Sequence, residues 1–126
     1  MAQSIFERYG GFASVSRIVS EFYRKVVDSD VLADYFDGID MRTLIDHQTK
    51  FIAQLMGGPA SFTDEHIARV HSHLGITDHA FTEMTTLLRE TLEDFDFDET
   101  DISVVHGEVL ARKPYVVTGR EESWAG

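Results

Sequence analysis

The sequence predicts an all-α fold, and three observations carry this prediction. Apolar residues recur at helical spacing in five separate segments. No segment alternates between apolar and polar residues in the way that a half-buried strand does, and capping residues precede three of the five segments. The 126 residues are expected to form one domain over residues 1–113, followed by a disordered tail over residues 114–126.

The five apolar stripes follow one another along the chain, and glycine pairs at residues 10–11 and 57–58 punctuate them. The first stripe comprises Phe12, Val15, Ile18, Val19, Phe22 and Val26. The second comprises Leu44, Gln48, Phe51, Ile52 and Leu55, and the third Ile67, Val70, His71 and Leu74. The fourth comprises Phe81, Met84, Leu88, Leu92 and Phe95, and the fifth Ile102, Val105, Val109 and Leu110.

Capping residues support the starts of the last three predicted helices. Thr63 precedes two acidic residues, which suit the first turn of a helix. Thr77 or Asp78 can open the fourth helix and Asp98 the fifth. A short helix is also expected around Ser4–Tyr9, and residues 28–40 form a tight connection between the first two stripes.

Composition and charge exclude several classes of function. The net charge of −11 argues against binding to nucleic-acid backbones and to anionic membrane surfaces. No apolar run approaches the roughly 18 residues that span a bilayer, and the first residues do not resemble a secretory signal. Without cysteine there is no disulfide, thiolate metal site or cysteine nucleophile. We therefore expect a cytoplasmic protein, and we expect it to be a monomer.

Two histidines stand two residues apart in the third helical segment, at positions 71 and 73. Successive residues of a helix are about 100° apart, so the two side chains cannot share a face. His71 belongs to the apolar stripe, whereas His73 points about 200° away from it. Taken alone, His71 is read as a core histidine whose ring bonds to a backbone carbonyl.

Other polar side chains are expected to face the same apolar seam. His47 and Gln48 straddle the centre of the apolar face of the second helix, and Tyr23 stands one step from the first stripe. Taken alone, Tyr23 is read as a tyrosine whose hydroxyl lies at the surface. Burying such groups without partners would cost a few kcal/mol each. A large apolar cofactor with a metal at its centre would satisfy them together.

Other metal sites fit the sequence less well. A closed zinc site needs four ligands, usually cysteine or histidine, and di-iron bundles use Glu-x-x-His on two helices, a motif that the chain lacks. A haem needs a single proximal histidine and an apolar slot, and the sequence supplies both.

Four segments carry a resemblance to a known family: IFERYGG, EFYRKVVDSDVLADYFDGIDM, LIDHQTKFIAQLMGGPASFT and ARVHSHLGIT. Together they resemble the truncated haemoglobins of group I, from residue 4 to about residue 112. The resemblance implies a truncated globin fold, in which a two-over-two helical sandwich surrounds haem b.

The resemblance also implies roles for individual residues. His71 takes the place of the proximal iron ligand, and Tyr23 and Gln48 take the places of the donors to bound oxygen. His47 resembles the histidine that, in cyanobacterial members, binds iron from the distal side when no gas is present. His106 lies earlier in the last helix than the histidine through which some relatives bond the haem covalently, so no cross-link is expected.

Further residues are expected to hold the haem. Leu44 and Phe36 take the places of the apolar distal residue and of the ring packed on the haem face. The walls of the cavity are expected to include Phe51, Ile52, Leu55, Ile76, Phe81 and Met84. Lys50 and Arg69 are the candidate partners of the haem propionates, with simple surface solvation as the alternative.

The resemblance leaves the physiological role open between classes. One function is reversible binding of O2, with CO and NO as further ligands, for oxygen transport or storage. The alternative is an enzyme, a nitric-oxide dioxygenase that converts NO and bound O2 to nitrate and needs a partner reductase. Electron transfer through a bis-histidyl haem and gas sensing are further alternatives.

Overall fold

The computed structural model describes residues 3–59, 62–72 and 74–119, and within these ranges the chain forms helices and no strands. In chain order these are α1 (Ile5–Arg8), α2 (Gly11–Val27), a short 3-10 helix η1 (Ala33–Phe36), α3 (Met41–Leu55), α4 (Asp64–His71), α5 (Asp78–Asp94), α6 (Glu99–Ala111) and α7 (Lys113–Val116). The predicted all-α fold is therefore confirmed. None of the helices in the described ranges has the length and apolar character needed to cross a bilayer.

Side-chain caps fix where several helices begin. Ser4 and Glu7 form a reciprocal capping box at α1. The side chains of Asp40, Thr63 and Thr77 accept hydrogen bonds from backbone N–H groups in the first turns of α3, α4 and α5. These bonds satisfy donors that have no partner within the helix, so the sequence sets the helix boundaries locally.

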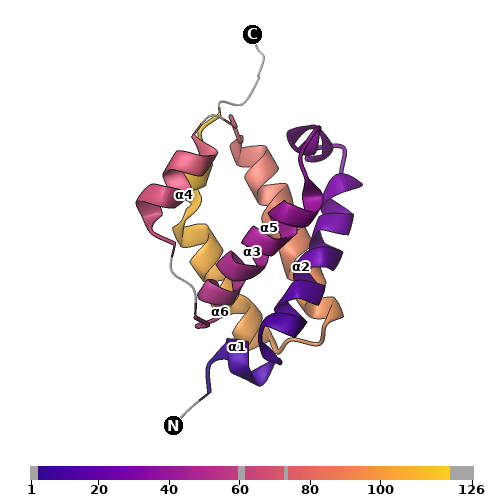
Figure 1. Ribbon diagram of the computed structural model, residues 1–126, viewed down its shortest axis with the longest axis vertical. Helices are drawn as coiled ribbons and strands as arrows, with labels where there is room; N and C mark the ends of the chain where they lie inside the picture. The colour runs from indigo at the N-terminus through magenta and orange to yellow at the C-terminus, as the bar shows by residue number, and fades with distance from the viewer. Residues whose placement is uncertain (1–2, 60–61, 73, 120–126) are drawn as a thin grey trace.

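The helices pack as two pairs, one on the other. The packing of α2 against α3 forms one pair, and that of α5 against α6 forms the other, in which the two helices run in opposite directions (Figure 1). The contact between α2 and α5 joins the pairs. Apolar residues of α2 centred on Val15, Ile18 and Val26 are almost completely buried at this junction, as the two-over-two arrangement requires.

The glycine pairs allow close approaches near the N-terminus. Gly10 has φ +105°, a left-handed conformation that glycine adopts without strain, and it turns the chain between α1 and α2. At Gly58, an added Cβ would lie 2.7 Å from the ring of Phe6 and 2.9 Å from the carbonyl oxygen of Ala53. The absence of a side chain therefore lets α1 pack directly on the end of α3.

A buried carboxylate ties α1 to the start of α6. Asp101 is only 6% exposed, and its side chain accepts hydrogen bonds from Arg8 Nη1 (2.9 Å) and Nη2 (2.7 Å) and from the hydroxyl of Tyr9 (2.7 Å). The hydrogen bonds from Arg8 contribute most to holding the pKa of Asp101 below its usual range. The Tyr9 ring also stacks on Phe97, with 3.7 Å between centroids.

Part of the expected tail is folded. Pro114 lies at the start of α7, where a missing N–H leaves no helix hydrogen bond unmade, and Val116 is 7% exposed. The backbone N–H groups of Thr118 and Gly119 both donate to the carbonyl oxygen of Ile76, at 3.0 and 2.9 Å. The packed chain thus extends beyond the expected boundary at residue 113, and residues 120–126 of the expected tail lie outside the described residues.

Four members of the predicted apolar stripes are exposed: Phe12, Val70, Leu74 and Leu110. Phe12 is 41% exposed and packs edge-on against Phe6, with 4.9 Å between ring centroids. Leu110 is 47% exposed, although it continues the predicted stripe of α6. Apolar residues occur on several sides of α6, so spacing alone does not define which of them face the core.

Candidate functional site

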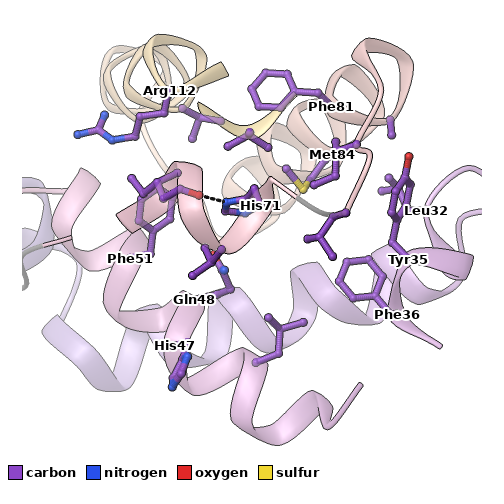
Figure 2. A pocket seen from close by; sticks show the side chains of 18 of the residues that line it. Leu32, Tyr35, Phe36, His47, Gln48, Phe51, His71, Phe81, Met84 and Arg112 are labelled. Carbon is purple, nitrogen blue, oxygen red and sulfur yellow. Dashed lines mark hydrogen bonds between the residues drawn. The ribbon is translucent and has the colours of Figure 1, made fainter. Parts of the chain in front are cut away.

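A pocket of about 290 Å³ lies between α3, α4 and α5, and residues of α2, η1, α6 and α7 complete its lining. Most of the lining side chains are apolar (Figure 2). Six of the residues predicted to surround a cofactor line it: Phe36, Leu44, Phe51, Ile76, Phe81 and Met84. An apolar cavity with a few polar groups directed into it is the usual form of a cofactor site.

His71 lies in this pocket at the C-terminal end of α4 and is half-buried. Its Nδ1 lies 2.7 Å from the carbonyl oxygen of Ile67 (Figure 2). A carbonyl only accepts, so Nδ1 carries the proton and Nε2 keeps its lone pair. Nε2 has no hydrogen-bond partner within the described part of the chain. The ring thus bonds to the backbone, as a core histidine would, and still offers a ligand nitrogen.

Tyr23 brings a phenol from α2 to the same pocket. It is 6% exposed, and its ring packs edge-on against Phe22 and Phe36, with centroids 4.9 and 5.7 Å away. Its hydroxyl has no hydrogen-bond partner among the residues that the structure describes. Burial raises the pKa of Tyr23, so the hydroxyl stays protonated and remains a donor. The interpretation of Tyr23 taken alone, with its hydroxyl at the protein surface, is therefore wrong.

Gln48 and His47 are neighbours on α3 and differ in orientation. Gln48 is half-buried, lines the pocket and reaches from α3 towards His71 (Figure 2). His47 also borders the pocket, but its side chain is exposed and turned away from His71 (Figure 2). The amide is therefore positioned as a donor to the cavity, whereas the imidazole stands at the rim.

Four residues expected to contact the cofactor lie elsewhere. Ile52 and Leu55 are 7% and 5% exposed but do not line the pocket. They belong to the side of α3 buried in the core, whereas Leu44, Gln48 and Phe51 follow the pocket side at intervals of four and three residues.

The two expected cationic partners, Lys50 and Arg69, are also outside the pocket lining. Lys50 Nζ pairs with Asp46 at 3.3 Å, one turn away on the exposed side of α3. Arg69 Nη2 lies 3.3 Å from Nδ1 of His66. Sequence spacing predicted both cations near the site, but it did not show which side of α3 and of α4 faces the cavity.

Several lining residues were not singled out as cofactor contacts from sequence. They include Leu32, Tyr35, Phe62, His66, Val109 and Arg112. Val109 belongs to a predicted stripe, but a stripe does not distinguish a pocket wall from a core position. Val70 and Leu74 also line the pocket and are 43% and 40% exposed, because they face the cavity instead of another helix.

Residues 4–112 match the family described as bacterial-like globin. The chain belongs to this family. Among curated relatives, the group 1 truncated hemoglobin GlbN of Mycolicibacterium paratuberculosis is 30% identical to this globin over 116 residues, which cover 92% of this chain and 85% of the relative. The group 1 truncated hemoglobin of Tetrahymena thermophila is 29% identical over 91 residues, covering 72% and 75%. The resemblance to the truncated haemoglobins of group I is therefore confirmed.

Solved structures confirm the globin fold. The truncated hemoglobin of Tetrahymena pyriformis in its Fe(III) form superposes with a TM-score of 0.80 at 24% identity, covering 93% of this globin and 99% of that chain. The 2/2 hemoglobin of Synechococcus, in a structure with covalently attached heme, gives a TM-score of 0.79 at 26% identity, covering 90% and 98%. The predicted two-over-two sandwich is the fold that these proteins share.

As a member of this family, the globin is a haem-binding, gas-binding protein of the haemoglobin type. Its pocket fits such a cofactor on two observations. His71 Nε2 and the Tyr23 hydroxyl have no partners in the described ranges, and both residues line one apolar cavity. No cluster of three or more carboxylate, histidine or cysteine side chains suited to a metal ion occurs among the described residues, and haem iron needs only one such ligand.

Proposed function

We propose that this globin would hold haem b through His71 as the proximal iron ligand and would reversibly bind O2 in the cavity that Tyr23 and Gln48 also line. One observation carries the proposal: the Nδ1–H of His71 is bonded to Ile67, which leaves Nε2 available in a cavity that Tyr23 also lines. Ferrous haem supplies an open coordination position for O2, CO or NO.

The bond from His71 to the backbone serves ligation. A histidine that binds a metal generally donates its second ring N–H to a carboxylate, a carbonyl or water, which fixes the tautomer and the ring orientation. In this chain the acceptor is the carbonyl of Ile67, one turn earlier on α4. Because Ile67 is itself buried, at 3% exposure, packing fixes the position of the acceptor.

Tyr23 and Gln48 supply hydrogen-bond donors in a largely apolar space. The raised pKa of Tyr23 keeps its hydroxyl protonated, and the Gln48 amide carries two N–H donors. A diatomic ligand that gains partial negative charge is stabilised by such donors, at roughly 1.5–3 kcal/mol for each charge-assisted bond. Ligands that gain less charge, such as CO, gain less from these donors. The two residues thus favour retention of O2 over CO.

The absorption spectrum of the purified protein tests the proposal. We expect stoichiometric uptake of haemin, and reversible spectral changes when the reduced protein is equilibrated with CO and with air. A preparation that is fully folded, by circular dichroism, and yet takes up no added haemin would contradict the proposal.

A further inference from the structure

One histidine of the pocket lining has no part in the proposed binding of oxygen. His66 lies in the first turn of α4, is half-buried, and stacks on Phe62 with ring centroids 5.6 Å apart and planes at 26°. Both residues line the pocket. Arg69, one turn later, lies outside the lining and approaches the ring of His66 from there, with Nη2 3.3 Å from Nδ1.

This contact with arginine determines the tautomer of His66. A guanidinium only donates hydrogen bonds, so Nδ1 must be the acceptor. A neutral imidazole that accepts at Nδ1 carries its proton on Nε2. Nδ1 is occupied from outside the pocket, so the ring edge that bears Nε2–H is the one available to the cavity. Nε2 has no partner in the described part of the chain.

The other polar side chains at the edges of the pocket bond within the protein, are enclosed by it or turn away from the cavity. The Tyr35 hydroxyl donates to a backbone carbonyl at 3.5 Å. Arg112 Nη1 donates to the carbonyl and to the carboxylate of Glu108, at 2.9 and 2.8 Å, and its Nε is enclosed by protein atoms without a hydrogen-bond partner. His47 is exposed and turned away from His71 (Figure 2). Nε2 of His66 is therefore a donor at the margin of the described lining that has neither a partner nor an enclosing contact in the described residues.

The position of His66 relative to His71 suits a group at the edge of a haem. They are five positions apart on α4, about 7.5 Å along the helix axis at 1.5 Å per residue. The two carboxylates of haem b are carried on its periphery, away from the iron. Building on the proposed function, we propose that His66 donates Nε2–H to a haem carboxylate and that Arg69 is a positioning residue that fixes the required tautomer.

The test compares haem b with its dimethyl ester, which keeps the ring and the iron but has no carboxylate. Each is loaded into the full-length protein, and its loss to an excess of an apoglobin acceptor is timed. His66→Phe keeps the stack on Phe62 and removes the donor. We expect it to speed the loss of haem b roughly tenfold, as the removal of one charge-assisted hydrogen bond does, and to change the loss of the ester less than twofold.

Arg69→Gln tests the positioning role, because glutamine can accept as well as donate and so no longer imposes the tautomer. We expect faster loss of haem b with no change for the ester. In long-range proton–nitrogen spectra, the Nε2–H signature of His66 should be present in the wild-type protein and mixed in this variant. The matched control is Arg42→Gln, an exposed arginine of α3 outside the pocket lining, which should change neither rate.

The outcomes separate this inference from the proposed function. If His66→Phe speeds the loss of haem b and of the ester equally, His66 only packs, and the inference is wrong. It is also wrong if neither rate changes, or if wild-type His66 carries its proton on Nδ1. If the wild-type protein takes up neither form of haem, it is the proposed function that fails.

Discussion

The Nδ1 atom of His71 lies 2.7 Å from the carbonyl oxygen of Ile67, one turn earlier on the same helix. A bond of this kind is expected of a buried histidine of either sort, structural or ligating. What distinguishes the two in this chain is the cavity beside the ring, which Tyr23 enters from another helix.

Replacing His71 by leucine should abolish stoichiometric haem binding, because the variant lacks the imidazole that we propose as the iron ligand. The measurement is the absorbance of the reconstituted protein per mole of chain, with and without CO. His106→Leu is the matched control, since His106 lies on α6 outside this pocket. An unaltered spectrum for His71→Leu would show that the ligand has been assigned wrongly.

Replacing Tyr23 by phenylalanine should accelerate O2 dissociation by roughly 10–100-fold, which corresponds to the loss of one charge-assisted hydrogen bond. Stopped-flow displacement of O2 by CO measures the rate. The haem-free protein should not lose stability to urea, because the Tyr23 hydroxyl has no partner in the described structure that the variant would leave unpaired. A dissociation rate within twofold of the wild type would exclude Tyr23 as a donor.

The reduced, gas-free protein should be high-spin and five-coordinate, because His47 is exposed and turned away from His71 (Figure 2). His47→Leu should then leave the visible spectrum unchanged under argon. If the wild-type spectrum is low-spin and the variant's is high-spin, the His47 side chain turns into the pocket and binds the iron. Apparent gas affinity would then fall by the fraction of molecules in which His47 occupies the sixth position.

Replacing Asp101 by asparagine should destabilise the haem-free protein by about 1–2 kcal/mol at pH 7, a modest value because Arg8 is partly exposed. The folded-state pKa of Asp101 is depressed, chiefly by hydrogen bonds from Arg8. The carboxylate therefore contributes fully above its ordinary pKa of about 3.9, and the contribution is lost as pH falls through the lower folded-state value. The difference between wild type and variant in urea unfolding should shrink below about pH 4; a constant difference would contradict this.

Mixing the air-equilibrated, haem-loaded protein with NO separates oxygen binding from dioxygenase activity. We expect consumption of about one equivalent of NO per haem, after which the iron stays oxidised until it is reduced. Continued turnover in the presence of a cellular reductase, followed as nitrate formed, would instead assign the enzymatic function. Tyr23→Phe should lower the rate of NO consumption, in a single reaction or in continued turnover, only because the variant retains O2 less well.

Much of the fold could be predicted because helical periodicity and caps are local properties. The stripe through Ile18 and Phe22 and the cap at Thr63 define their helices without reference to the rest of the chain. The short helix α7 could not be foreseen in this way. Its position depends on the burial of Val116 and on the bonds that Thr118 and Gly119, just after the helix, donate to Ile76, a residue about 40 positions earlier in the sequence.

The candidate site was predicted where a residue's role depends on its own helix, and missed where it depends on a neighbour. His71 and Gln48 lie on the pocket side of their helices, as their positions in the stripes indicated. Ile52 lies one position beyond Phe51 and yet faces the core, because the packing of α3 on α2 decides the division between the two sides. The relation of Arg69 to His66 depends on side-chain conformation, which spacing does not define.

Val70 and Leu74 are 43% and 40% exposed although both line the pocket. A chain that has not bound its cofactor exposes this apolar surface to water. Covering the surface with haem stabilises the protein by about 25 cal/mol for each Å² of apolar surface buried. Because haem binds the native state, its supply raises resistance to unfolding in proportion to the logarithm of its free concentration. We therefore expect chains that fold without a supply of haem to be the ones most exposed to aggregation and proteolysis.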